Sequence, residues 1–491
     1  MCLALKHITL SRLQRAAALN GLREWLAPDL ESSRSALSII RARQDGAVIL
    51  VSRLLAPWLA DDAFISSVLD AANLASGPKK RKLSVLAAAV DEVPCFDPDT
   101  GSFGSSEGIS VLLGRAKYLM PRLWRPEDAP TTPQQAQQAS LDFRLCQVPP
   151  LKVTVPVANT LFTADKRHVL FASRWLAGAT HGLELVEKAE KTKATLQIWP
   201  KNDQKPARLL ANLIPVTRPR KVLASLGNIL SKIEIGGQPA PPSQELETIL
   251  PGLLNARRER LGGSHTDSRP PSSIGVWALT IPKTVLDVYP MNTEADWQQY
   301  GWNLLLEAGC HFSKVGECIC PRGRWFSIVD LTFGDKVSGG GGWGLKQGLL
   351  SLDPQTTFDT DEDRDLQQFM KSFQGEASPE SFVQFFIEGP HPSRITNDPS
   401  WGSSSTSTTV IGTPGAIVGS AAAMAGGVSA CPGLFGAVSE AGVYLESQGD
   451  GETRHAIATK LDASRSYVVM SPASRKSSDA AFIGRDQELV S

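Results

Sequence analysis

The chain has 491 residues, which is long enough for two to four domains or for one large unit in two parts. Hydrophobic residues make up 42% of it, so the sequence predicts a globular body with a sizeable core. The 50 basic and 50 acidic residues balance, and this argues against a protein attracted as a whole to nucleic acid or to a membrane surface. The seven cysteines are odd in number and irregularly spaced, which favours free thiols in a reducing compartment.

The first 25 residues have the composition of a mitochondrial transit peptide. No acidic residue precedes Glu24, and apolar residues alternate with basic ones: Lys6, Arg12, Arg15 and Arg23. The alternative is an ordinary amphipathic helix that packs on the body. The first interpretation predicts a mitochondrial protein, and the second leaves it cytoplasmic.

Residues 26–124 are predicted to form an α/β domain at the N-terminus. The run Ala47–Val51 is apolar and rich in β-branched residues, which indicates a buried strand. A helix capped by Asp61 and Asp62 follows, and two further buried strands are expected at Leu83–Val90 and Gly108–Leu113. Strand, helix and strand in this order favour a parallel or mixed sheet.

Asp91 follows the second of these strands directly. Open α/β sheets bind ligands at the carboxyl ends of their strands, so Asp91 is a candidate ligand contact. Alternatively, its side chain caps the turn that leads through Pro94.

The same stretch resembles the N-terminal half of the FIST sensory-domain family. The resemblance rests on the order of Gly46–Ser52, a helix, Leu83–Pro94 and Glu107–Leu113, and it covers about 70 residues. It implies a domain that binds small ligands. No signature motif aligns residue by residue, so no binding residue is carried over from the family.

Residues 125–140 are rich in Pro and Gln and are predicted to be a linker. A central α/β region is expected over 141–390, with an internal linker at 262–273. Its expected strands are 153–157, 167–171, 195–199, 274–281, 311–320 and 325–333, and residues 378–388 are expected to close its ordered part. Its expected helices are 183–193, 218–233, 243–261 and 295–308. The predicted fold class is therefore α/β or α+β, with mixed covered sheets flanked by helices.

The composition changes beyond Pro390. Residues 391–491 are rich in Ser, Gly and Ala, and a largely disordered low-complexity tail is expected there. The stretch 415–431 carries no charge, but it is at the lower limit of length for a membrane helix and contains many glycines. An integral membrane span is therefore not expected.

A glycine-rich loop follows the strand expected at 325–333. Its residues Gly339, Gly340, Gly341, Gly342, Trp343, Gly344 and Lys346 form the candidate ligand-binding site. Glycines let backbone amides approach an anionic ligand closely. The loop lacks the long helix of a dinucleotide fingerprint and the Lys-Ser/Thr pair of a P-loop. The alternative is a tight connection under which Trp343 packs.

Three further groups of residues have some features of a functional site. Cys310, His311, Cys318 and Cys320 lack the spacing of a zinc knuckle, so no metal is assigned. Ser106 stands in a Gly-x-Ser-x-Gly match, but no strand-to-helix turn is expected around it. The basic residues Arg218, Arg220 and Lys221 start a predicted helix, and a solvated face is favoured over RNA binding.

No catalytic residue is assigned, and the cofactor is unknown. The leading hypothesis is a non-enzymatic protein that binds a small ligand or a protein partner. One alternative is an enzyme that acts on a phosphorylated or nucleotide substrate through residues 339–346. The other is an RNA-associated mitochondrial factor.

Overall fold

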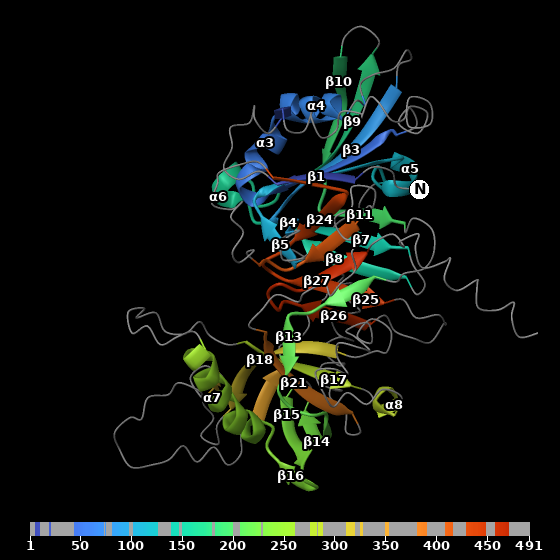
Figure 1. The fold of residues 1–491 in the computed structure, drawn as a ribbon. Coiled ribbons are helices and arrows are strands. Elements are labelled where there is room, and N and C mark those ends of the chain that lie inside the picture. The colour runs from blue at the N-terminus through green and yellow to red at the C-terminus, as the bar shows by residue number, and fades with distance from the viewer. Residues whose placement is uncertain are drawn as a thin grey trace, which may run out of the picture.

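A computed structural model of the protein describes residues 5–9, 19–20, 44–72, 74, 81–97, 102–125, 139–146, 150–178, 182–199, 207–226, 229–260, 275–281, 283–287, 311–319, 325–327, 349–352, 381–389, 408–415, 429–447 and 457–470. Strands hold 56% of the interpretable residues and helices 19%. The predicted class, α/β or α+β with mixed sheets flanked by helices, is therefore wrong, and the fold is mostly β. Figure 1 shows three tiers of sheets stacked along the long axis of the molecule.

The first tier is a seven-stranded sheet in the order β10-β9-β3-β2-β6-β1-β23. Its strands are β1 (Leu5–Thr9), β2 (Gly46–Ser52), β3 (Arg81–Val90), β6 (Gly108–Gly114), β9 (Leu170–Gly178), β10 (Gly182–Glu190) and β23 (Ser429–Pro432). Only β2 and β3 run parallel among these pairings, and the other neighbours are antiparallel. The strands expected at Ala47–Val51, Leu83–Val90 and Gly108–Leu113 are confirmed.

Two helices cover the outer face of this sheet: α3 (Ala56–Ala60) and α4 (Asp62–Ala71). Asp61 caps α4 as expected, since its Oδ1 accepts a hydrogen bond of 2.8 Å from the amide of Ala63. The apolar residues of α4 pack on the side of β2 that carries Ile49. The opposite side of β2, which carries Leu50, packs toward the second tier. Because both faces of these strands are buried, their sequences are continuous apolar runs.

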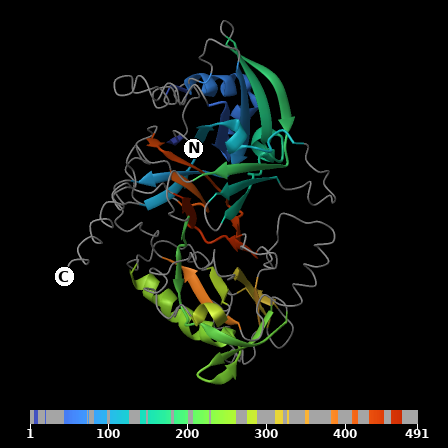
Figure 2. The same cartoon turned by 90° about the vertical axis from the view of Figure 1, so that its right-hand side faces the viewer.

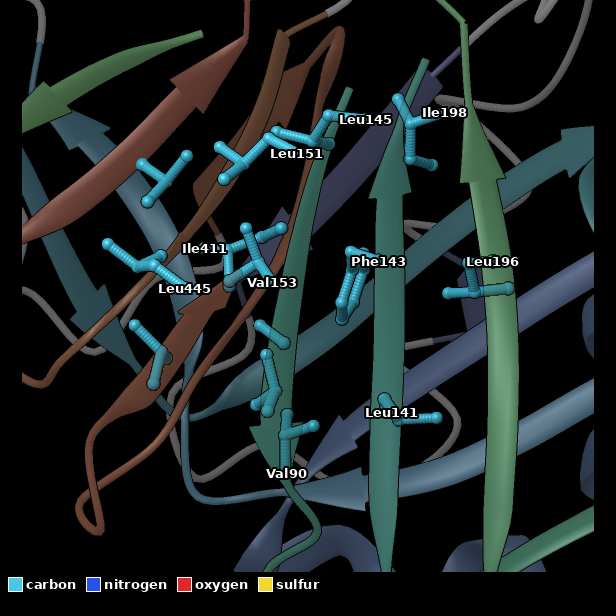
Figure 3. Close-up of a cluster of buried hydrophobic side chains, with 14 of the residues drawn as sticks. Val90, Leu141, Phe143, Leu145, Leu151, Val153, Leu196, Ile198, Ile411 and Leu445 are labelled. Carbon is cyan, nitrogen blue, oxygen red and sulfur yellow. The ribbon is translucent and has the colours of Figure 1, made fainter. Parts of the chain in front are cut away.

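The second tier contains two sheets. The five-stranded sheet has the order β11-β7-β8-β25-β26, and the four-stranded sheet has the order β12-β27-β22-β24. Their strands are β7 (Ser140–Leu145), β8 (Leu151–Pro156), β11 (Lys193–Ile198), β12 (Arg208–Leu210), β22 (Thr408–Gly412), β24 (Leu434–Val438), β25 (Val443–Ser447), β26 (Ile457–Leu461) and β27 (Tyr467–Met470). Figure 3 shows Phe143 of β7, Val153 of β8 and Ile411 of β22 in the shared core. A hairpin, β4 (Val93–Asp97) and β5 (Ser102–Ser106), packs beside β24.

The third tier is built from β13 (Leu213–Pro215), β14 (Arg220–Leu226), β15 (Ile229–Ile235), β16 (Gln238–Ala240), β17 (Val276–Ile281), β18 (His311–Ile319), β19 (Trp325–Ser327), β20 (Leu349–Leu352) and β21 (Phe382–Glu388). The path β21-β14-β15-β20-β18-β17 returns to β21, so six antiparallel strands close into a ring. Helix α7 (Ser243–Arg260) packs on this ring through Leu246 and Leu250, and Figure 2 shows it along one side. The helix expected at 243–261 is confirmed.

Two helices expected in the central region are wrong. Residues 183–193 lie mostly in β10, where Leu183 and Leu185 pack on the sheet with a period of two. Residues 218–233 form β14 and most of β15. The apolar residues of that stretch fit a helical stripe, but they equally fit two strands separated at Gly227 and Asn228.

The C-terminal region also departs from the expectation of a largely disordered tail. Residues 408–415, 429–447 and 457–470 contain six strands, β22 to β27. Val410, Ile411, Phe435 and Val469 of these strands are fully or almost fully buried. Long-range pairing and burial therefore overcome the small-residue composition of this part of the chain.

Candidate functional site at the carboxyl ends of β2 and β3

The predicted ligand loop, Gly339 to Gly344 with Lys346, lies outside the described residues. The described strands on either side of it are β19, which ends at Ser327, and β20, which begins at Leu349. The second sequence candidate, Asp91, is described. It follows β3 directly, at the end of the sheet where the parallel strands β2 and β3 both finish.

The Asp91 carboxylate is mostly buried and has three polar neighbours. Its Oδ2 accepts a hydrogen bond of 2.8 Å from the amide of Glu440 and one of 3.3 Å from the hydroxyl of Ser439. Its Oδ1 lies 3.5 Å from a guanidinium nitrogen of Arg53, which follows β2. Burial raises the pKa of Asp91, against the opposing effect of the Glu440 amide and of Arg53. Asp91 therefore holds together the ends of two strands and a turn from the C-terminal region.

Arg53 also binds the side chain of Glu440. Its two terminal nitrogens donate hydrogen bonds of 3.1 Å each to the two carboxylate oxygens. This bidentate arrangement raises the pKa of the Arg53 guanidinium. The pair is partly exposed, with 38% of the Arg53 side chain and 53% of the Glu440 side chain accessible.

A loop beside Asp91 is attached to the end of β3 at both of its ends. The amide of Ala158 donates to the carbonyl of Ala89 at 3.0 Å, and the amide of Ala89 donates to the carbonyl of Val169 at 2.9 Å. Between these attachments the chain forms α6 (Leu161–Ala164), a single helical turn. Asp165 ends that turn with a left-handed backbone, at φ +54°.

The buried Thr160 joins the two sides of this loop by hydrogen bonds. Its amide donates to the carbonyl of Arg167 at 3.0 Å, and its hydroxyl donates to the carbonyl of Lys166 at 2.7 Å. Its own carbonyl accepts from the amide of Ala164 at 2.8 Å. The loop is thus fixed by several hydrogen bonds at a residue with no accessible surface.

The closed loop presents apolar side chains to solvent. Phe162 is 96% exposed and Leu161 is 48% exposed. Helix α6 contacts α3, and the turn that precedes α3 carries Leu54, which is 55% exposed. Figure 1 shows α3 and α6 side by side on the same flank of the first tier. Leu54, Leu161 and Phe162 are called the Phe162 face below.

Comparison with protein-family models, with curated proteins and with solved structures found no match to this chain. The resemblance of residues 46–113 to the FIST family therefore stays a prediction.

The other sequence candidates are not brought together at this edge. Ser106 ends β5, and β6 follows after one residue, so the strand-to-helix turn that a nucleophile elbow needs is absent there. Cys310 and Cys320 lie outside the described ranges, and only the backbone of the intervening strand β18 is described. Within the described part of the chain, no group of three His, Cys, Asp or Glu side chains could hold a metal ion.

Arg220, one of the candidate RNA contacts, already has an acidic partner. Its Nε lies 3.1 and 3.2 Å from the two carboxylate oxygens of Glu245 on α7, and its Nη2 bonds the same group. This ion pair raises the pKa of the Arg220 guanidinium. Arg220 therefore connects β14 to α7 instead of standing free for a phosphate.

Sequence reasoning identified Asp91 but missed Arg53, Glu440 and the Phe162 face. One local signal was present. Leu161 and Phe162 form an isolated apolar pair among the turn-forming residues Asn159, Thr160 and Asp165. An apolar pair in such a polar setting is too short to form an apolar strand or helix face that packs on the core.

The helices in the described ranges include none that is long and apolar enough to cross a lipid bilayer.

Proposed function

We propose that the protein is a non-enzymatic binding protein that holds a protein partner on the Phe162 face. The observation that carries the proposal is Phe162, which is 96% exposed on a loop closed by hydrogen bonds. Full burial of a Phe side chain gains about 1.5–3 kcal/mol relative to its exposure. A partner that covers Phe162 would gain this free energy on binding, because the Phe162 side chain is exposed in the unbound protein.

The loop favours binding because its shape is set before a partner arrives. Association costs free energy for every side chain and loop that must be ordered at the interface. Thr160 and the attachments at Ala89 fix the backbone on both sides of Phe162, which lowers that cost. Aromatic anchors with apolar neighbours are typical of the few residues that dominate binding free energy. Leu161 is next to Phe162 in the chain, and Leu54 lies in the turn before α3, the helix that contacts α6.

Site-specific photo-crosslinking in cells tests this proposal. A benzophenone amino acid replaces Phe162 in one variant and Val186 in another. Val186 is a suitable control because it is 56% exposed on β10, the edge strand of the seven-stranded sheet. We expect a crosslinked product of defined mass from position 162 and little from 186. Adding Leu54→Asp should lower the yield about tenfold, which corresponds to roughly 1.4 kcal/mol.

Two results would remove the proposal. Equal crosslinking from positions 162 and 186 would mean that Phe162 meets other molecules only by collision. A product from position 162 that is insensitive to Leu54→Asp would mean that the three residues do not form one binding surface.

Mitochondrial targeting by residues 1–25 is part of the proposal, on the basis of their composition. Leu5–Thr9 within this segment is strand β1, which pairs with β6 and β23. A deletion of residues 1–25 would therefore also disturb the sheet. The cleaner test fuses residues 1–25 to a fluorescent protein. We expect the fusion to overlap a mitochondrial dye, and a uniform cytosolic signal would reject the targeting claim.

A further inference from the structure

We infer that the polar face of the five-stranded sheet binds one phosphate group of a small phosphorylated ligand at Arg144 of β7. This site goes beyond the proposed partner binding and does not depend on it. Three features of the face carry the inference: the register of its strands, the ion pairs of its lysines and the burial of Arg144.

The register brings one polar side chain from each of four strands into a row. Phe143 of β7 points into the core, as Figure 3 shows, so its neighbour Arg144 lies on the opposite face of the sheet. Residues that are paired across strands point to the same face. The residues paired in this way are Gln197 of β11, Arg144 of β7, Lys152 of β8 and Glu446 of β25, called the Arg144 row below.

Arg144 differs from the lysines of this face in having no acidic partner. Three lysines each lie beside a carboxylate: Lys152 at 2.5 Å from Glu446, Lys193 at 3.6 Å from Asp142 and Lys460 at 3.6 Å from Asp462. Arg144 forms no ion pair with the described residues, and its Nε is buried without a hydrogen bond to them. A buried charged donor without a partner costs free energy, and a bound anion would supply the partner.

Arg144 also stands directly opposite a second cation. Lys152 is its partner in the antiparallel pair of β7 and β8, and such positions hold their Cβ atoms about 4.5–5.5 Å apart. Like charges at directly opposite positions destabilise a sheet. Only 13% of the Lys152 side chain is accessible, so solvent ions screen the repulsion poorly. An anion between Arg144 and Lys152 would replace this repulsion by attraction to both.

The donors of the Arg144 row suit a phosphate group. Arg144 has a planar fork of N–H donors, Lys152 has an ammonium group and Gln197 has an amide, so three neighbouring strands contribute donors. A phosphate offers several acceptor oxygens to such a set. Because each lysine of the face is matched by a carboxylate, a single cation is left over. One phosphate fits that excess, whereas a nucleic-acid strand requires a series of unpaired cations.

Isothermal titration calorimetry of the full-length chain with inorganic phosphate, at constant ionic strength, tests the inference. We expect saturable binding that chloride does not reproduce. Arg144→Gln should weaken it at least about tenfold, since it removes the guanidinium fork and its charge. Arg144→Lys keeps the charge without the fork, so it should weaken binding by a smaller factor.

Lys460→Gln provides the matched control. It removes one positive charge from the same face, but Lys460 already has Asp462 as its partner. This variant should bind phosphate like the unchanged protein.

Melting temperatures distinguish a binding role of Arg144 from a structural one. In buffer without phosphate, Arg144→Gln should melt at the same temperature as the unchanged protein or higher, because the repulsion with Lys152 is gone. Added phosphate should raise the melting temperature of the unchanged protein and not that of Arg144→Gln.

Four results would overturn the inference. They are an absence of saturable phosphate binding, equal weakening by Arg144→Gln and Lys460→Gln, and a lower melting temperature of Arg144→Gln without phosphate. The fourth is a short single-stranded RNA whose binding both variants weaken equally, because the face would then be an extended nucleic-acid site. None of these results bears on the Phe162 face, which has its own test by crosslinking.

Discussion

Arg53 and Glu440 lie 387 positions apart in the chain and are joined by two hydrogen bonds of 3.1 Å. The contact brings the end of β2 against the turn between β24 and β25, which belongs to the C-terminal region. Asp91 supports it from the buried side at 3.5 Å from Arg53. The N-terminal sheet and the C-terminal strands therefore meet at Arg53, the residue that precedes Leu54.

The two partners of this ion pair should differ in their effect on stability. Glu440→Ala removes an exposed ion pair and should lower the free energy of unfolding by less than about 1 kcal/mol. Arg53→Ala also leaves the mostly buried Asp91 without a cation and should cost about 1–3 kcal/mol. Urea denaturation measures both values. Equal losses would contradict the part assigned to Asp91.

Stability should depend on pH through Asp91. Burial raises the pKa of this carboxyl in the folded protein above its ordinary value of 3.8. The folded state then binds more protons than the unfolded state, so stability falls as the pH rises from 3.8 through the folded pKa. We expect the unchanged protein to lose stability relative to Asp91→Asn across that interval. Urea midpoints from pH 3.5 upward measure the difference, and a constant difference would contradict the assignment.

The hydroxyl of Thr160 should support the binding loop. Thr160→Val removes the hydrogen bond of 2.7 Å to the carbonyl of Lys166 and should cost about 1 kcal/mol. Hydrogen exchange should become faster over residues 160–167, and crosslinking from position 162 should fall although Phe162 itself is unchanged. Thr160→Ser retains the hydroxyl and serves as the control. Loss of crosslinking in both variants would show that the hydroxyl is not the cause.

The pairing of β22 with β24 in the C-terminal region can be tested by replacing a glycine. A Cβ at Gly436 in β24 would lie 1.6 Å from the carbonyl oxygen of Val410 in β22, so Gly436→Ala should cost at least about 3 kcal/mol. Gly252 on α7 has no neighbour within 4 Å of such an atom, and Gly252→Ala should gain about 0.4–1 kcal/mol. Thermal unfolding compares the two. Equal melting temperatures would contradict the packing of β22 against β24.

The sequence predicted the strands that are buried on both faces, because their apolar runs have no other stable arrangement. The strands predicted at Ala47–Val51 and Leu83–Val90 are the clear cases, and the cap of α4 at Asp61 was predicted as well. The helix expected at 218–233 was wrong because the spacing of its apolar residues fits the period of a helix and the period of a strand equally well. The dipeptide Gly227-Asn228 was the available signal for a hairpin.

The C-terminal strands could not be predicted from composition, since their partners are distant in the chain. β25 pairs with β8, and β23 pairs with β1. The candidate site was predicted only at Asp91, because the end of a buried strand can be located locally. Arg53 and Glu440 meet through the fold, and the exposure of Phe162 depends on how the loop is anchored at Ala89.

Our proposal assigns Phe162 to binding and not to folding. One variant, Phe162→Asp with the benzophenone at Leu161, separates the two roles when its melting temperature and its in-cell crosslinking are both measured. Phe162 is 96% exposed, so we expect an unchanged melting temperature and a loss of at least about 90% of the crosslinked product. An unchanged yield of product, or a melting temperature lowered by several degrees, would overturn the proposal.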